Sequence, residues 1–330
     1  MKFLFLTDTH FTAKNPASRI DDIQDTIIKK LLDIKQIIID ECIDVVLHGG
    51  DMFHTPDVSN RFTGEIAEIF KSYGVPIYVV PGNHDIYGYN NTTIGNTKLG
   101  LLEKTGIINI LDRTSPLVFN DGGFKIGVEG QEYHAHIDEN MTEDFRVYNL
   151  SVDYSILITH SMLLDHEFFK DIKHTLINDV ITSADLVLAG HYHPGFKEVE
   201  KNGVNYFNPG SMLRVDSSTN SFKNMPRVIV FDIDSTGVKS KYVELSSAKK
   251  AVDVFSAKNM NAKTYNNTLE SFHNKLKNTK LKGISILDLI DDYVKDNNGD
   301  VIVADYAKNM ISHIDSEKSC DNGFAPSINT

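Results

Sequence analysis

The chain has 330 residues, of which 41% are hydrophobic and 24% charged, and its formal net charge is −12 at pH 7. This length can bury a substantial core and predicts one large domain, alone or with a smaller appendage. The negative net charge argues against a general nucleic-acid binder, which usually has a basic surface. It does not exclude one, because bound divalent cations and local lysine clusters can make the electrostatic potential positive at the binding surface.

The sequence shows no sign of a membrane or secretion segment. Its longest apolar runs are only strand-sized, and the chain enters a strand-like run at Lys2 without a basic leader or a cleavage site. Its two cysteines, Cys42 and Cys320, cannot form a disulfide framework, and their isolation argues against a thiolate metal site. We therefore expect no membrane association and a reducing, cytoplasmic setting.

The first 80 residues alternate between strand-like and helix-like patterns. The strands are short β-branched runs, and the helices have apolar residues three or four apart. The predicted elements are a strand at 2–7, a helix at 20–41, a strand at 44–48, a helix at 59–73 and a strand at 76–80. This order predicts a largely parallel sheet packed by helices. Ligands of such sheets gather beyond the carboxyl ends of the strands.

The middle of the chain is richer in short strands separated by turns. The predicted strands lie at 107–111, 117–119, 125–129, 154–159, 185–189, 195–200, 204–207, 227–232 and 239–245. Two sheets packed face to face would accommodate this order of strands.

The composition changes near residue 246. The segment 246–250 is typical of a linker, and the region 246–318 is predicted to be mainly helical, as a separate unit after a catalytic domain at 1–245. The last residues, 319–330, are polar with Gly and Pro and are expected to be disordered. Lysines gather at 275–282. A solvated helix face is the simpler interpretation of this cluster, and contact with DNA phosphates is the alternative.

Side chains able to bind metals follow five of the predicted strands. They are Asp8 and His10, then Asp51, then Asn83 with His84 and Asp85, then His160, and finally His191 and His193. All of these except His84 and Asp85 form the set of seven candidate ligands. One such site would mean little, but five in series at strand ends predict a composite metal centre. Two cations about 3.5–4 Å apart can acidify a bridging water and neutralise the oxygens of a phosphodiester. A set without cysteine suits manganese, iron or zinc.

Three other histidines have simpler interpretations. His48 lies inside a strand-like run and is expected to pack in the core. His134 and His136 have a spacing that metal ligands also use, but seven ligands are already supplied elsewhere. A solvated loop, at the rim of the site or away from it, is therefore the favoured interpretation.

The order and spacing of the metal-competent motifs resemble the full signature of the calcineurin-like metallophosphoesterases. The resemblance covers about residues 1–245 and implies their α/β fold, with two packed mixed β-sheets flanked by helices. Within this superfamily, two features are similar to the SbcD-type double-strand-break-repair nucleases: His54, three residues after Asp51, and the turn at Asn208-Pro209-Gly210-Ser211. The chain is short for that subgroup, so we expect its DNA-binding cap to be reduced or absent, as in a compact, phage-like member.

The resemblance also implies a role for each residue. Asp8, His10 and His193 would bind the first metal, Asn83, His160 and His191 the second, and Asp51 would bridge them. His84 would contact the scissile phosphate, as transition-state stabiliser or leaving-group acid. Asp85 would orient His84 by a hydrogen bond. His54 would help to position the nucleic-acid backbone, although a surface-loop histidine is the alternative.

The leading hypothesis is a DNA nuclease of repair, recombination or replication that hydrolyses phosphodiesters with metal-activated hydroxide. Its cofactors would be two divalent ions, manganese first, with iron, zinc or magnesium as alternatives. Its partners would be DNA and an SbcC-like ABC-type ATPase that docks on the helical C-terminal region, and a homodimer is left open. The first rival is a phosphatase or phosphodiesterase for a small phosphate ester. The second is a non-catalytic scaffold, which would not need seven ligands.

Overall fold

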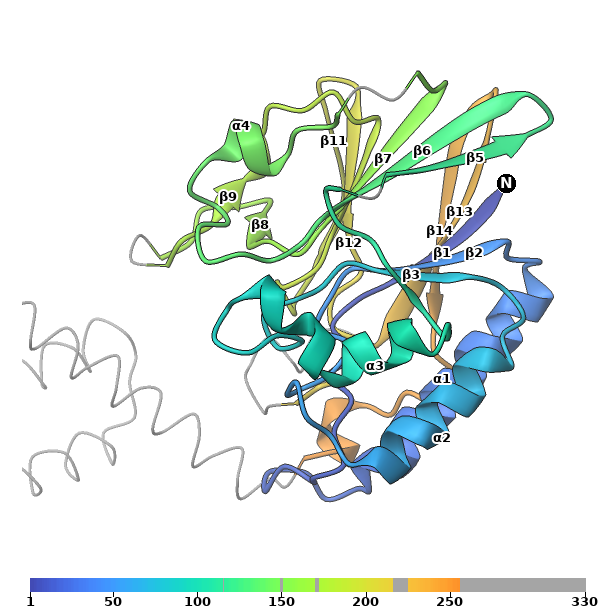
Figure 1. Cartoon of the computed structure of the whole chain (residues 1–330), viewed down its shortest axis with the longest axis vertical. Coiled ribbons are helices and arrows are strands. Elements are labelled where there is room, and N and C mark those ends of the chain that lie inside the picture. Colours follow the sequence, from blue (N-terminus) through green and yellow to red (C-terminus); the bar gives the residue numbers. More distant parts are fainter. Residues whose placement is uncertain (115, 149–150, 170–171, 216–224, 256–330) are drawn as a thin grey trace, which may run out of the picture. The chain divides into compact units, whose positions relative to one another are not determined.

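The computed structural model describes residues 1–114, 116–148, 151–169, 172–215 and 225–255. This part of the chain forms two six-stranded sheets and the helices that pack on them (Figure 1). The expected α/β fold with two packed mixed sheets is confirmed. Most of the predicted helical region at 246–318, with its lysine cluster, and the tail at 319–330 lie outside the described residues. Within the described residues, no helix is long and apolar enough to cross a membrane.

The first sheet has the strand order β14-β13-β1-β2-β3-β4. Its strands are β1 (Lys2–Leu6), β2 (Val45–His48), β3 (Ile77–Val79), β4 (Asn109–Ile110), β13 (Arg227–Asp234) and β14 (Gly237–Glu244). Strands β1 to β4 pair in parallel, whereas β13 is antiparallel to both β1 and β14. The three strands expected in the first 80 residues are therefore neighbours, and their carboxyl ends lie at one edge of the sheet.

The second sheet has the strand order β11-β12-β10-β7-β6-β5. Its strands are β5 (Leu117–Asp121), β6 (Phe124–Gln131), β7 (Tyr154–Thr159), β10 (Leu186–Ala189), β11 (Phe196–Lys201) and β12 (Val204–Asn208). The inner strands β6, β7, β10 and β12 are parallel, and an antiparallel strand lies at each edge. Alternate residues of the two sheets, such as Phe5, Leu47, Ile158 and Leu188, form one buried apolar cluster between them.

Helices cover the outer face of the first sheet (Figure 1). They are α1 (Ile23–Asp40), α2 (Asn60–Lys71) and α3 (Lys98–Lys104), the last preceded by the 3₁₀ turn η1 (Asn91–Asn96). Helix α1 begins later than the sequence pattern predicts, because the side chain of Asp22 caps it by accepting a hydrogen bond from the Asp25 amide. Ile20 therefore lies outside the helix, and it is 63% exposed.

The outer face of the second sheet is covered by residues between β6 and β10, apart from β7, which belongs to the sheet. This segment contains α4 (Met141–Asp144), β8 (Leu163–Leu164), β9 (Thr175–Leu176) and the 3₁₀ turn η2 (Ile177–Asp179). Its buried residues, among them Phe145, Leu164 and Ile177, pack on Leu157 and Val187 of the sheet. Both sheets are thus covered on both faces, which explains why their inner strands are apolar almost throughout.

The chain remains packed on the first sheet and its helices beyond residue 245, where the sequence analysis places a linker. Ser246 Oγ and the Ser247 amide donate hydrogen bonds to the carboxylate of Asp33 on α1, at 2.7 Å each. The 3₁₀ turn η3 (Ala251–Asp253) follows, and Phe255 forms a bridge with Arg19. The expected linker is therefore fixed to this body, which extends at least to Phe255.

Candidate metal centre

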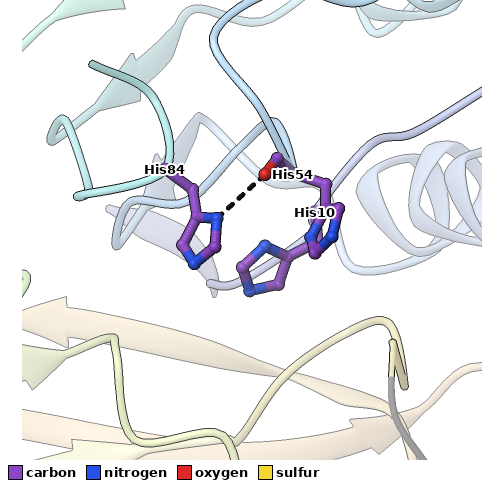
Figure 2. A group of neighbouring side chains, drawn as sticks. All are labelled: His10, His54 and His84. Atoms are coloured by element: carbon purple, nitrogen blue, oxygen red, sulfur yellow. Dashed lines mark hydrogen bonds between the residues drawn. The ribbon is translucent and has the colours of Figure 1, made fainter. Parts of the chain in front are cut away.

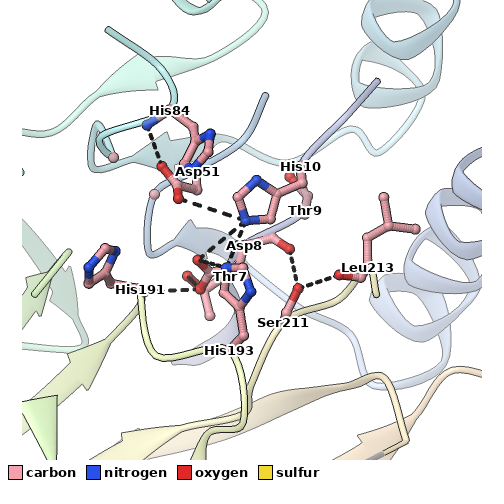
Figure 3. A network of polar contacts seen from close by, with 12 residues as sticks. Thr7, Asp8, Thr9, His10, Asp51, His84, His191, His193, Ser211 and Leu213 are labelled. Atoms are coloured by element: carbon pink, nitrogen blue, oxygen red, sulfur yellow. Dashed lines mark hydrogen bonds and ion pairs between the residues drawn. The ribbon is translucent and has the colours of Figure 1, made fainter. Parts of the chain in front are cut away.

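The metal-competent motifs meet where the two sheets present the carboxyl ends of their parallel strands. Asp8 and His10 follow β1, Asp51 follows β2, and the loop of Asn83 follows β3. His160 follows β7 and His191 and His193 follow β10 of the other sheet. Figure 3 shows these loops approaching one another from the two sheets. The centre is composite, as the sequence predicts, because each loop alone supplies only one or two of its side chains.

A first group consists of Asp8, His10, Asp51 and His193, whose ligand atoms all lie within 4.8 Å of one another. The Nε2 atoms of His10 and His193 are 2.8 Å apart. His193 Nε2 lies 3.4 Å from Asp8 Oδ1, and His10 Nε2 lies 3.7 Å from Asp51 Oδ2. Two imidazoles and two carboxylates thus point at one small volume (Figure 3).

A second group consists of Asp51, His160 and His191, and it shares Asp51 with the first. His160 Nε2 lies 3.4 Å from Asp51 Oδ2 and 3.2 Å from Asn83 Oδ1. The other nitrogen of this ring, Nδ1, lies 2.7 Å from the carbonyl oxygen of Gly49. A proton on Nδ1 donated to this carbonyl leaves Nε2 free to act as a ligand, an arrangement common among metal-binding histidines.

The backbone is strained at the candidate ligands. Asp8, His10, Asp51 and His191 have φ angles of 52°, 42°, 52° and 74°, in the left-handed region that most residues avoid. Such strain persists only where the surroundings enforce it, and it is concentrated at functional sites. Here the Asp8 amide bonds to the Gly50 carbonyl and the His10 amide to the Asp51 carbonyl, at 3.0 Å each. The two loops therefore hold one another in this conformation.

Glycines allow the loops to approach this closely. A Cβ atom on Gly82 would lie 2.2 Å from Asp51 Oδ1, and one on Gly50 would lie 2.3 Å from His160 Nδ1. Gly50 also has a φ of 98°. Gly50 and Gly82 are therefore required by the space around His160 and Asp51.

His48, the last residue of β2, connects the loop of Asp8 and His10 to the loop of Asp51. Its Nδ1 accepts a hydrogen bond from the Gly50 amide at 3.1 Å, and its Nε2 lies 3.0 Å from Thr9 Oγ1. Because Thr9 Oγ1 donates to the Met52 carbonyl, the Nε2–H of His48 donates to Thr9. Burial lowers the pKa of His48 to about 3, so the ring is neutral. The prediction of a core histidine is correct, and the structure adds that this histidine connects the Asp8 and Asp51 loops.

The two carboxylates of the centre are held ionised. Burial opposes ionisation of Asp8, but the hydrogen bond and charge of His193 outweigh it and lower the pKa of Asp8 to about 2. Burial likewise opposes ionisation of Asp51, and the charge of His160 holds the pKa of Asp51 well below its usual range. Ionised carboxylates are the form in which these side chains bind cations.

The histidines differ in their pKa. Burial lowers the pKa of His10 to about 3 and that of His191 to about 4, so both imidazoles are neutral. For His160 the charge of Asp51 and its hydrogen bond outweigh burial, and they raise the pKa to about 9. A proton on His160 thus takes the place, beside Asp51, that a cation could take.

These observations fit a pair of divalent cations. Among the described residues, Asp8 Oδ1 is buried, and only a long contact with His193 Nε2, at 3.4 Å, serves it. So weak a contact is costly for a buried carboxylate unless a cation satisfies it. The donor set combines imidazole nitrogens with carboxylate and amide oxygens, as manganese, iron and zinc prefer. One carboxylate, that of Asp51, belongs to both groups. Two cations sharing Asp51 would satisfy all of these side chains.

A third group consists of His10, His54 and His84 (Figure 2), and it shares His10 with the first. His54 and His84 are less buried than His10. The rings of His54 and His84 are stacked, with centroids 5.4 Å apart and planes 16° from parallel. His84 Nδ1 lies 2.8 Å from the carbonyl oxygen of His54, and the His84 amide donates to Asp51 Oδ1 at 2.8 Å. His84 is thereby fixed beside the shared carboxylate with its Nε2 atom free of these bonds.

The expected hydrogen bond from Asp85 to His84 is not found among the described residues. The Asp85 carboxylate is buried and accepts from three backbone amides instead, those of Met52, Phe53 and Gly82, at 3.2, 2.9 and 2.9 Å. His84 is oriented by the His54 carbonyl. Asp85 therefore supports the backbone of the Asp51 loop rather than the ring of its neighbour.

The Asn208–Ser211 turn begins at the last residue of β12 and contacts the loops that carry the first group of candidate ligands. Ser211 Oγ lies 2.9 Å from the carbonyl oxygen of Asp8 and 2.6 Å from that of Leu213 (Figure 3). The Ser211 amide donates to the His193 carbonyl at 2.9 Å. This turn joins the loops that carry Asp8 and His193.

One aromatic residue at the site was not singled out from the sequence. The ring of Tyr133, which follows β6, lies 5.9 Å from that of His191 and 6.3 Å from that of His160. Its neighbours His134 and His136 pair with Asp144 and Glu139 and are not part of the three groups. Tyr133 follows a parallel strand closely, as the candidate ligands do, and this position is the sequence signal that could have identified it.

The two-sheet fold and the shared aspartate define a phosphoester hydrolase that works with metal ions. The calcineurin-like phosphoesterase family matches residues 1–195, more than half of the chain, and the chain belongs to this family.

Among curated proteins, the chain is similar to two archaeal proteins named DNA double-strand break repair protein Mre11. That of Archaeoglobus fulgidus is 22% identical over 66% of this chain and 51% of its own length. That of Sulfolobus acidocaldarius is 24% identical over 66% of this chain and 54% of its own length. The chain thus spans about half the length of these relatives. Among solved structures, a putative 5'-nucleotidase from Staphylococcus aureus matches 74% of this chain and 54% of its own, with 12% identity and a TM-score of 0.46.

Proposed function

We propose that the chain is a DNA nuclease that hydrolyses phosphodiesters with two divalent metal ions, preferably manganese. In this proposal Asp8, His10 and His193 hold one ion, Asn83, His160 and His191 hold the other, and Asp51 belongs to both. The support is the two side-chain groups that share Asp51. When bound, the two cations supply an acidified water and neutralise charge on the phosphoryl oxygens.

The observation that carries the proposal of nuclease activity is the stacked pair His54–His84 beside Asp51. The Nδ1–H of His84 donates to the His54 carbonyl, so His84 Nε2 is the atom available to a phosphate. In its protonated form this atom donates a hydrogen bond to a phosphoryl oxygen or a proton to the leaving oxygen. His54 extends this surface outward, where it contacts the backbone of a polymeric substrate. The names of the similar archaeal proteins support DNA as that polymer.

The test compares substrates on the purified full-length chain in manganese. Single- and double-stranded DNA are offered beside p-nitrophenyl phosphate and cyclic nucleotides, and kcat/KM is measured for each. The proposal expects cleavage of DNA with a higher kcat/KM than for the small esters. Brisk turnover of small esters without cleavage of DNA would contradict it and favour a phosphatase or phosphodiesterase of small molecules. A His84→Ala preparation purified in parallel controls for contaminating nucleases.

Partners and location form a separate part of the proposal. An SbcC-like ATPase and a second copy of this chain are the proposed protein partners, and the cytoplasm is the proposed location. The support is the resemblance of the Asp51–His54 motif and the Asn208–Ser211 turn to SbcD-type nucleases. Co-purification of the ATPase with the full-length chain, but not with a chain ending at residue 255, would support docking on the C-terminal region. Equal recovery with both would contradict it.

A further inference from the structure

A row of aromatic rings leads from the second histidine group toward solvent. The centroid of the Tyr133 ring lies 6.3 Å from that of His160, 5.9 Å from that of His191 and 5.7 Å from that of Tyr89, and none of these rings is stacked face to face on it. His160 is fully buried, Tyr133 is half-buried, and Tyr89 is 58% exposed. The row thus begins at the candidate metal centre and ends on the surface.

The segments that carry these tyrosines are fixed in place. The Tyr133 amide donates to the Pro81 carbonyl at 3.0 Å, beside the Gly82-Asn83-His84 motif. The Tyr133 carbonyl accepts from Asn91 Nδ2 at 2.8 Å, which ties it to the loop of Tyr89. The two tyrosines are therefore held as a pair, and the pair is attached to the loop that carries His84.

Tyr89 combines features that packing alone does not explain. It has a φ of 57°, in the left-handed region, although it is neither glycine nor a residue that tolerates this region well. More than half of its surface faces solvent, so its ring buries little area in exchange for this strain. An exposed, strained aromatic residue next to a reaction centre indicates contact with a ligand.

We infer that Tyr89 and Tyr133 form a stacking platform for an unpaired base of the nucleic acid whose phosphate lies at His84. Aromatic rings suit this task because every base has a π face, so stacking does not depend on the nucleotide sequence. A base in a duplex is already stacked on its neighbours, and the platform therefore favours single-stranded or frayed DNA. This inference rests on the proposed nuclease function and specifies its substrate.

The competing explanation is that Tyr133 only shields His160 and His191 from water. In that case its loss would lower metal content and slow every substrate alike. A stacking platform instead acts on substrates that carry bases and leaves metal content intact. The two roles are separated by comparing substrates that differ only in their bases.

The experiment measures kcat/KM in manganese for oligothymidylate and for an oligomer of the same length made of abasic tetrahydrofuran units. The wild-type protein should prefer the oligomer with bases. Tyr89→Ala and Tyr133→Leu should each reduce this preference about 5-fold or more, the effect of losing one base–aromatic contact. Tyr133→Phe keeps the ring and should keep the preference. Metal content, measured by plasma mass spectrometry, should equal that of the wild type in all of these variants.

Tyr87→Leu is the matched control. Tyr87 lies two residues before Tyr89, is 43% exposed, and makes no ring contact within the described part of the chain. This variant should keep the preference for bases.

Four results would overturn the inference. Equal cleavage of the two oligomers by the wild type, or an unchanged preference in Tyr89→Ala and Tyr133→Leu, would overturn it while the nuclease function stands. Loss of metal from Tyr133→Leu, together with an unchanged preference in Tyr89→Ala, would assign shielding instead. Failure to cleave either oligomer, with turnover of small esters, would overturn the proposed function and the platform with it.

Discussion

The ring of His84 and the backbone carbonyl of His54 are joined by a hydrogen bond of 2.8 Å. The partner on His54 is thus a backbone atom, and it remains when the side chain of His54 is replaced. The side chain of His54 contributes its own contact, the stacked ring at 5.4 Å. The two histidines therefore have separable roles.

Replacement of His84 should cost far more activity than replacement of His54. His84→Ala removes the group offered to the phosphate, and we expect kcat to fall by roughly 100-fold or more, the range of general-acid contributions. His54→Ala leaves His84 oriented by the same carbonyl, and we expect a smaller loss, mainly in KM for DNA. Steady-state kinetics on DNA, with metal content measured in each preparation, tests both. Loss of metal in His84→Ala would show that its role is misassigned.

Asp85 should matter for stability. Its carboxylate accepts from three buried backbone amides, and Asp85→Ala leaves all three without this acceptor. An unsatisfied buried donor costs about 1–3 kcal/mol, so we expect Tm to fall by roughly 5–10 °C. Asp85→Asn should be intermediate, because one oxygen can still accept from Met52 and Gly82. Asp57→Ala removes a carboxylate that is 72% exposed and pairs with Lys98, and it should change Tm little. Equal shifts for Asp85→Ala and Asp57→Ala would contradict the role of Asp85.

The sequence predicts that Asp85 bonds to His84, whereas in the structure it bonds to backbone amides. This difference shows which contacts a sequence can predict. Ligand candidates such as Asp8 and His191 follow their strands directly, so a local pattern is enough to find them. Two of the three amides that bond to Asp85, those of Met52 and Phe53, belong to a loop more than 30 residues away in the chain. No side-chain pattern encodes a backbone amide, and the hydrogen bond could not be predicted.

Two features of the fold show the same limit. Helix α3 is missing from the prediction because seven residues are too few for a clear helical period. The sequence pattern predicts that α1 starts at Ile20, because isoleucine continues the apolar spacing of the helix. In the structure the helix begins only after its N-cap, Asp22. The capping residue and the apolar spacing thus predict different starts for this helix.

Lys30 should make stability depend on pH. Its side chain is buried on α1, where it donates to the Met212 carbonyl at 2.5 Å, and burial lowers its pKa to about 7. Above pH 7 the unfolded chain binds a proton that the folded chain lacks, so stability rises with pH between about 7 and 10. The rise should approach, at most, about 1.4 kcal/mol per pH unit.

The measurement is urea unfolding at pH 7 and pH 9. Lys30→Met should lose this part of the increase seen in the wild type. Lys29→Met changes an adjacent lysine whose side chain is 57% exposed, and it should keep the increase. Equal increases in the wild type and Lys30→Met would show that Lys30 stays charged in the folded protein.

The most direct test of the two-metal centre is the metal content of Asp51→Ala. Asp51 belongs to both ligand groups, so its loss should weaken both sites together. After loading with manganese and removal of excess metal, mass spectrometry should find two ions per wild-type chain and fewer than one per Asp51→Ala chain. His191→Ala, which affects the second group alone, should retain close to one ion. Two ions in Asp51→Ala, or one or none in the wild type, would contradict a dinuclear centre built around Asp51.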